Sequence, residues 1–167
     1  MSATSRAPRE GEVNGVHYHF VTREQFRQMI ADEAVLEYTE YCGNYYGTPR
    51  RAVEDMLNAG KDVILKIEVE GAMNIKRLFP ECCLVFILPP SMQELERRLR
   101  KRGTETEDKI IERTAQAREE LKFAENYDYL IVNGELEKAV EDLKAVLTAE
   151  KLRRSRRMPL LEKLREE

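Results

Sequence analysis

Features that would place this chain among membrane, zinc-binding or secreted proteins are missing from its 167 residues. The three cysteines have no C-x-x-C or zinc-like spacing, and Cys82 and Cys83 are adjacent, which indicates reduced thiols inside a cytosolic protein. No apolar run approaches the ~20 residues that a membrane helix needs, and the residues after Met1 begin no signal peptide. We therefore predict a cytoplasmic protein without a membrane partner.

An excess of either charge is also missing, because 28 Lys and Arg residues are balanced by 31 Asp and Glu residues. The net charge of −3 provides no general basic field for nucleic acid. One local basic run, residues 153–157, is interpreted as the solvated end of a helix rather than as a nucleic-acid contact. We expect no nucleic-acid partner and no metal ligands among the site residues.

Three short apolar runs are rich in β-branched or aromatic residues and are bounded by turn residues. They predict buried strands at residues 62–69, 83–88 and 129–132. Helical patterns accompany them: a capping box at residues 91–94, a longer helix from 106 to about 126, and a last helix whose Leu136, Val140, Leu143 and Leu147 would face the core. Strands that alternate with helices predict an α/β fold with a parallel sheet.

The first fifty residues have a different pattern. Short aromatic strands are predicted at residues 18–21 and 35–41, with a helix over 23–32 between them. This stretch holds five of the seven tyrosines. We predict a small β-rich subdomain over about residues 1–52.

Phosphate-compatible donors gather in this subdomain. Arg6 and Arg9 lie three residues apart, and Tyr18, Tyr45 and Tyr46 add hydroxyl groups. Arginine forks and hydroxyls together suit a phosphate monoester, because each phosphate oxygen accepts charge-assisted hydrogen bonds. Surface arginines are common, so a solvated loop is the alternative interpretation of the arginines alone.

Two further polar residues suit a purine base. Glu37 lies within an otherwise aromatic strand, and its carboxylate could accept both the N1–H and the exocyclic amine of guanine, a pairing that adenine does not offer. Thr48 could then address the O6/N7 edge. Discrimination of this kind is large, because the wrong base leaves buried polar groups unpaired.

These residues lie within motifs that resemble the guanylate kinase family in order and spacing, from Ser2 to about Arg157. The motifs are residues 2–12, 43–49, 67–72, 86–91, 100–106 and 129–133. The resemblance implies an α/β fold of the P-loop nucleoside-monophosphate-kinase type: a three-layer parallel sheet, a small β-rich GMP-binding subdomain and a helical lid. It also implies the reaction of ATP with GMP to give ADP and GDP, with Mg²⁺ accompanying ATP.

The resemblance assigns a single guanylate kinase-like domain to residues 1–167. Within it, about residues 1–52 would bind GMP, residues 60–90 and 127–157 would form the core, and residues 91–126 would form the lid and the helix that follows it.

The resemblance also implies roles for individual residues. Ser2, Arg6, Arg9, Tyr18 and Tyr46 would hold the GMP phosphate; Glu37, Thr48 and Glu68 would bind guanine; Arg98, Arg102 and Arg113 would be the catalytic lid arginines over the ATP phosphates; and Asn133 would lie at the adenine end of the ATP pocket. From the residues alone, the favoured interpretation of Glu68 is a strand-end carboxylate facing solvent, and that of the arginines from 97 to 102 is a solvated charge run.

Two positions depart from the family's pattern. Lys66 stands where the family usually has an acidic residue, and it reverses the local charge. Glu70 replaces a common glutamine, which is a milder change.

A phosphate-cradling loop, G-x-x-x-x-G-K-[ST], does not occur in the sequence. Only Gly60 is followed by a lysine, Lys61. The motif would also need a glycine five residues before Gly60 and a serine or threonine after Lys61, but these positions hold Asp55 and Asp62. In the family this loop lies upstream of the segment that begins at Ser2, so we expect an N-terminally truncated sequence that lacks the first strand, the loop and the first helix. Such a chain would be inactive as written. The alternative is a non-catalytic module that binds GMP or a phosphorylated protein.

Overall fold

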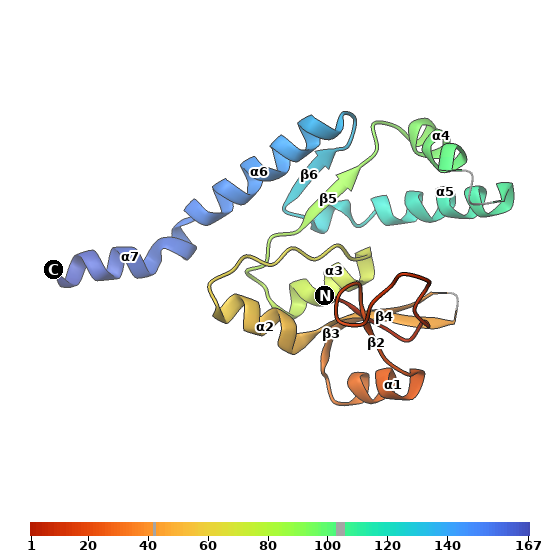
Figure 1. The fold of residues 1–167 in the computed structure, drawn as a ribbon. Helices are drawn as coiled ribbons and strands as arrows, with labels where there is room; N and C mark the ends of the chain where they lie inside the picture. The colour runs from red at the N-terminus through yellow and green to blue at the C-terminus, as the bar shows by residue number, and fades with distance from the viewer. Residues whose placement is uncertain (42, 103–105) are drawn as a thin grey trace. The chain divides into compact units, whose positions relative to one another are not determined.

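The computed structural model describes residues 1–41, 43–102 and 106–167 (Figure 1). The contacts of the chain group into two compact units, Met1–Cys82 and Cys83–Glu167. Each unit contains its own sheet. In the part of the chain that is described, no helix is both long enough and apolar enough to cross a bilayer.

The first unit is built on a mixed sheet with the strand order β2-β1-β4-β3. Its elements are β1 (Ala3–Thr4), β2 (His19–Phe20), α1 (Arg23–Ala31), β3 (Val35–Tyr41), β4 (Asn44–Pro49), α2 (Arg50–Asn58) and α3 (Val69–Leu78). Strand β1 pairs parallel with β2 and antiparallel with β4, and β4 pairs antiparallel with β3. The predicted short strands and the helix between them are confirmed.

Helix α1 begins at a capping box and packs on this sheet. The Gln25 N–H donates to Thr22 Oγ1 at 3.1 Å, and the Thr22 N–H donates to Gln25 Oε1 at 2.8 Å, which satisfies two amides at the helix start. Phe26 is fully buried with Ala3. The Phe26 ring also stacks on Tyr45, with 5.2 Å between ring centroids. The helix therefore fixes one face of β4, the strand that carries two of the predicted site residues.

The predicted strand at residues 62–69 is wrong. Residues 61–68 form no strand, although their side chains alternate between two environments as they would in a strand. Val63, Leu65 and Ile67 pack against buried hydrophobic residues of the first unit, whereas Ile64 is 66% exposed. A strand requires a hydrogen-bonded neighbour as well as an extended backbone. Among the described residues, no strand pairs with this segment.

The second unit contains a parallel pair of strands, β5 (Val85–Leu88) and β6 (Tyr129–Val132), with Val85 opposite Tyr129. Its helices are α4 (Met92–Arg102), α5 (Glu107–Leu121), the short 3-10 helix η1 (Ala124–Asn126), α6 (Leu136–Leu152) and α7 (Arg154–Glu166). The two predicted strands here are confirmed, and so is the α/β class. Within the described residues the parallel strands of this unit form a pair rather than a wide sheet.

Of the four residues of α6 that were predicted to face the core, only two do so. Leu143 and Leu147 are half-buried, but Leu136 and Val140 are 65% and 40% exposed. The physical reason is the width of the sheet: two strands lie only about 4.8 Å apart and cover a small part of a helix of this length.

The basic run at residues 153–157 lies at the junction of α6 and α7. Buried Glu150 accepts a hydrogen bond from the Tyr129 hydroxyl at 2.9 Å and forms ion pairs with Arg153 at 3.0 Å and Arg156 at 3.4 Å. Two arginines of the run therefore have a carboxylate partner within the chain, while their side chains remain largely exposed.

Candidate functional site

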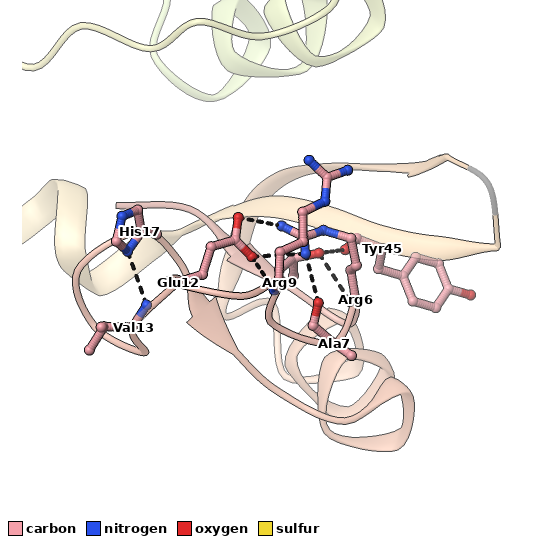
Figure 2. Close-up of polar contacts among 8 residues, drawn as sticks. Arg6, Ala7, Arg9, Glu12, Val13, His17 and Tyr45 are labelled. Atoms are coloured by element: carbon pink, nitrogen blue, oxygen red, sulfur yellow. Dashed lines mark hydrogen bonds and ion pairs between the residues drawn. The ribbon is translucent and has the colours of Figure 1, made fainter. Parts of the chain in front are cut away.

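The loop that follows β1 carries an arginine–carboxylate pair (Figure 2). Arg6 Nη1 and Nη2 donate to Glu12 Oε2 and Oε1, each at 2.9 Å, and Nη1 also donates to the Ala7 carbonyl at 2.7 Å. The hydrogen bond from Arg6, reinforced by the Arg9 backbone N–H, lowers the pKa of Glu12 to about 2. Glu12 therefore stays ionised at every physiological pH and holds the Arg6 guanidinium in a defined orientation.

Arg9 presents its guanidinium differently. Its backbone N–H donates to Glu12 Oε2 at 2.6 Å, whereas its side chain extends away from the loop (Figure 2). Within the described parts of the chain the guanidinium makes no ion pair. It is thus a cation available to a ligand, beside a second cation that the protein has already oriented.

Aromatic residues surround the Arg6 guanidinium. It lies 5.8 Å from the ring centroid of Tyr18 and 5.7 Å from that of Phe20. The Tyr18 and Tyr46 rings meet edge to face at 6.2 Å. The hydrogen bond to Glu12 contributes most to the raised pKa of Arg6, and Tyr46 adds to it.

Strand pairing explains why these residues meet. Thr4 lies opposite Tyr46 in the β1–β4 pair, and the Ser2 carbonyl accepts the His19 N–H at 2.9 Å, which ties the segment carrying Tyr18 to the start of the chain. The structure therefore brings Arg6, Tyr18 and Tyr46 into contact, whereas Ser2 is joined to this group through its backbone carbonyl and Arg9 through its backbone N–H to Glu12.

The residues predicted to read the base meet on β3 and β4. Glu37 is directly opposite Thr48 in the antiparallel register. The Thr48 hydroxyl donates to Glu37 Oε1 at 2.6 Å, and both residues are buried, with 8% and 6% of their surface exposed. The Thr48 backbone N–H also bonds this carboxylate, but an ionised carboxylate has about four acceptor positions, so Glu37 still suits a ligand that brings further N–H groups.

The electrostatic surroundings of Glu37 support this interpretation. Burial raises the pKa of the Glu37 carboxyl; the hydrogen bonds of Thr48 oppose that shift, and the negative charge of Glu68 adds to it. Glu68 is the exposed residue before α3, so it belongs to the same unit and is near enough to Glu37 to act on it. Buried carboxyl groups with a raised pKa and a nearby like charge are common at functional sites.

In the second unit, Arg98 is anchored by protein groups. Its Nε donates to Glu94 Oε1 at 2.7 Å, and Nη1 and Nη2 donate to the carbonyls of Asn133 and Gly134 at 2.8 and 3.2 Å. Arg98 and Asn133 also line one small pocket of about 170 Å³ together with Leu88 and Leu95. Arg98 thus lies beside Asn133, the residue predicted for the adenine end.

The other two predicted lid arginines lie on separate helices of this unit. Arg102 is exposed at the last residue of α4, and Arg113 is half-buried in α5. The motif 100–106 between them falls partly on residues 103–105, which lie outside the described residues.

Sequence reasoning missed the role of Glu12. The motif of residues 2–12 contains Glu12, but no function was predicted for it. Its position three residues after Arg9 and six after Arg6 was a usable signal, because an acidic residue so close to two arginines is a natural ion-pair partner.

The described residues contain no group of three or more His, Cys, Asp or Glu side chains placed to hold a metal ion. Mg²⁺ commonly binds through one or two carboxylates and the phosphates of its nucleotide, so a dedicated protein cage is not required.

Comparisons with known proteins agree with this geometry. The family model described as Guanylate kinase matches residues 1–150. The guanylate kinase of Desulfitobacterium hafniense (strain Y51) is 50% identical over 157 residues, covering 94% of this chain and 78% of that protein. The guanylate kinase of Bacillus subtilis (strain 168) is 49% identical over 166 residues, covering 99% and 81%. The crystal structure of guanylate kinase from Anaplasma phagocytophilum has a TM-score of 0.74 at 35% identity, covering 93% of this chain and 76% of that one.

Proposed function

This chain belongs to the guanylate kinase family of nucleoside-monophosphate kinases, and we propose that it serves the transfer of a phosphoryl group from ATP to GMP, giving ADP and GDP. In this proposal the first unit binds GMP, and residues of the second unit contact ATP. We also propose that the chain is a single guanylate kinase-like domain with a GMP-binding part, a core and a lid. The proposed location is cytoplasmic.

The observation that carries the proposal is the pairing of Glu37 with Thr48 in the unit that also holds Arg6 and Arg9. A buried carboxylate reads the N1–H and exocyclic amine of guanine, and the neighbouring Thr48 hydroxyl, once it turns its hydrogen from Glu37 Oε1 to the base, donates to the O6/N7 edge. The arginines, with Ser2, Tyr18 and Tyr46, neutralise the phosphate. Glu68 supports the base from the start of α3.

We assign the donor nucleotide to Arg98, Arg102, Arg113 and Asn133. The arginines supply positive charge near the transferred phosphate, and Asn133 lies toward adenine. Mg²⁺ would enter with ATP as part of the substrate, held by the nucleotide's phosphates.

A second candidate function follows from the absence of G-x-x-x-x-G-K-[ST] within these 167 residues. Loop amides and a lysine normally position the transferred phosphate, so residues 1–167 alone would bind GMP but transfer phosphate poorly. That property would suit a module that holds GMP or a phosphorylated protein through Arg6, Arg9 and Tyr18. The buried Glu37–Thr48 pair favours the enzyme, because a phosphopeptide presents no base.

Arg9→Ala is expected to weaken GMP binding by about 1–3 kcal/mol, the range for loss of a charged hydrogen bond. AMP binding should weaken equally, because the phosphate is common to both nucleotides. Isothermal titration calorimetry at one fixed salt concentration measures both. Arg51→Ala is the matched control, since the Arg51 side chain is 93% exposed and its pair with Asp55 is loose at 3.8 Å. Equal GMP affinity in the wild type and Arg9→Ala would remove Arg9 from the phosphate site.

The preference for GMP over AMP is expected to decrease as the pH is lowered. The decrease should begin at a pH above 4.5, the ordinary pKa of a glutamate side chain. Only the ionised Glu37 accepts two N–H groups, and burial raises its pKa, so protonation removes recognition earlier than for an exposed carboxyl. The ratio of the two affinities is the correct measure, because a phosphate monoester with a pKa of about 6 titrates in both nucleotides. A ratio constant from pH 7 to 4.5 would contradict the assignment.

A further inference from the structure

Gly71 is a buried glycine in the first turn of helix α3. Glycine is a poor residue for a helix, because it loses more conformational freedom on folding than alanine does. Its backbone does not require glycine, since among the described residues the glycines with positive φ are Gly11, Gly15, Gly43 and Gly60. The reason for glycine at position 71 therefore lies in the space around it.

That space is taken by Glu37. A Cβ atom built on Gly71 would lie 3.0 Å from Glu37 Oε2 and 3.5 Å from both Cβ and Cγ of Glu37. A separation of 3.0 Å is too short for an ordinary contact between carbon and oxygen, so a side chain here would push the carboxylate by a few tenths of an ångström. The other carboxylate oxygen, Oε1, is held by the Thr48 hydroxyl at 2.6 Å. The Glu37 carboxylate thus lies between the Thr48 hydroxyl on β4 and the backbone of Gly71 on α3, which carries no side chain.

We propose that Gly71 is a specificity-determining position of the guanine site, because its missing side chain lets Glu37 keep the orientation in which both carboxylate oxygens serve the base. This inference rests on the proposed function. Gly71 is a positioning residue, since it acts through Glu37. A methyl group at this position would force Oε2 to move while Thr48 retains Oε1, so the carboxylate would rotate away from a two-point contact.

The test uses the full 167-residue chain and titrates GMP and AMP separately by calorimetry. Gly71→Ala is expected to weaken GMP binding about tenfold, the scale of a small misplacement in a recognition site, and to change AMP binding less than twofold. The melting temperature should stay unchanged or rise, because alanine favours the helix. A general structural effect would instead lower the melting temperature and weaken both nucleotides.

A second variant tests whether Gly71 acts through Glu37. Glu37→Asp withdraws the carboxylate by one methylene, which makes room for the methyl group. Adding Gly71→Ala to Glu37→Asp should therefore change GMP affinity less than twofold. The same tenfold loss in both backgrounds would overturn the inference, and the double variant remains informative if Gly71→Ala alone does not fold.

Gly47→Ala is the matched control for a glycine with a purely structural reason. Its added Cβ would lie 2.6 Å from the Glu37 carbonyl oxygen and 3.0 Å from Phe26, so we expect a lower melting temperature and weaker binding of both nucleotides. Glu37→Gln separates the two hypotheses. If it leaves the GMP/AMP ratio unchanged, the proposed function fails; if it lowers the ratio while Gly71→Ala does not, only the role of Gly71 fails.

Discussion

A polypeptide of these 167 residues is expected to bind GMP yet to form GDP from GMP and MgATP at least ~10³-fold more slowly than the Bacillus subtilis relative. Phosphoryl transfer depends almost entirely on positioning and on neutralising charge at the transferred phosphate. A single cationic group in such a site is worth about 10³–10⁵ in rate, and the sequence contains no G-x-x-x-x-G-K-[ST] loop to supply amides and a lysine.

The measurement is a coupled assay for ADP and GDP on both proteins under the same conditions. Calorimetric binding of GMP to the same sample is the control, since it separates a folded chain without turnover from an unfolded one. A rate within tenfold of the relative would show that other groups, with Arg98, Arg102 and Arg113 as the first to examine, supply what the loop supplies elsewhere.

Glu37→Gln is expected to lower GMP affinity by about 1.5–3 kcal/mol, roughly tenfold to 150-fold, and to leave AMP affinity nearly unchanged. The amide keeps one acceptor oxygen but turns an N–H₂ group toward the donors of guanine. Calorimetry with both nucleotides gives the change in preference. Glu40→Gln is the matched control, because Glu40 lies on the same strand but pairs with Arg23 at 2.7 Å. A GMP/AMP ratio equal to that of the wild type would remove Glu37 from base recognition.

The thermal stability of Glu37→Gln should not fall with its GMP affinity. Because burial raises the pKa of Glu37 in the folded state, its contribution to stability is present below the unfolded pKa and is lost as the pH rises through the folded value. At neutral pH the wild type has therefore lost that contribution, whereas glutamine carries no charge to desolvate. The variant should melt at the same temperature as the wild type or higher, which is the behaviour of a residue retained for function.

Much of the candidate site could be predicted because it is local in sequence. Arg6 and Arg9 share one loop, and Tyr45, Tyr46 and Thr48 share one strand, so residue type and spacing were sufficient to group them. The resemblance to a known family joined these two groups, and the pairing of β1 with β4 is consistent with that grouping.

Contacts across long sequence separations were beyond such reasoning. The approach of Gly71 to Glu37 depends on where α3 lies against β3. Residues 62–69 have the composition and alternation of a strand, yet a strand forms only where a neighbour completes its hydrogen bonds.

The sequence alone determined which residues carry charge, hydroxyl groups or apolar surface, and with what period, because these properties belong to each residue and its near neighbours. It thereby determined the α/β class, the strands Val85–Leu88 and Tyr129–Val132, and the residues suited to phosphate and guanine. Tertiary structure decided which side chains are desolvated and which atoms meet. The raised pKa of Glu37 and the close approach of Glu37 to Gly71 arise only when distant segments pack together, since burial and close contact are properties of the whole fold.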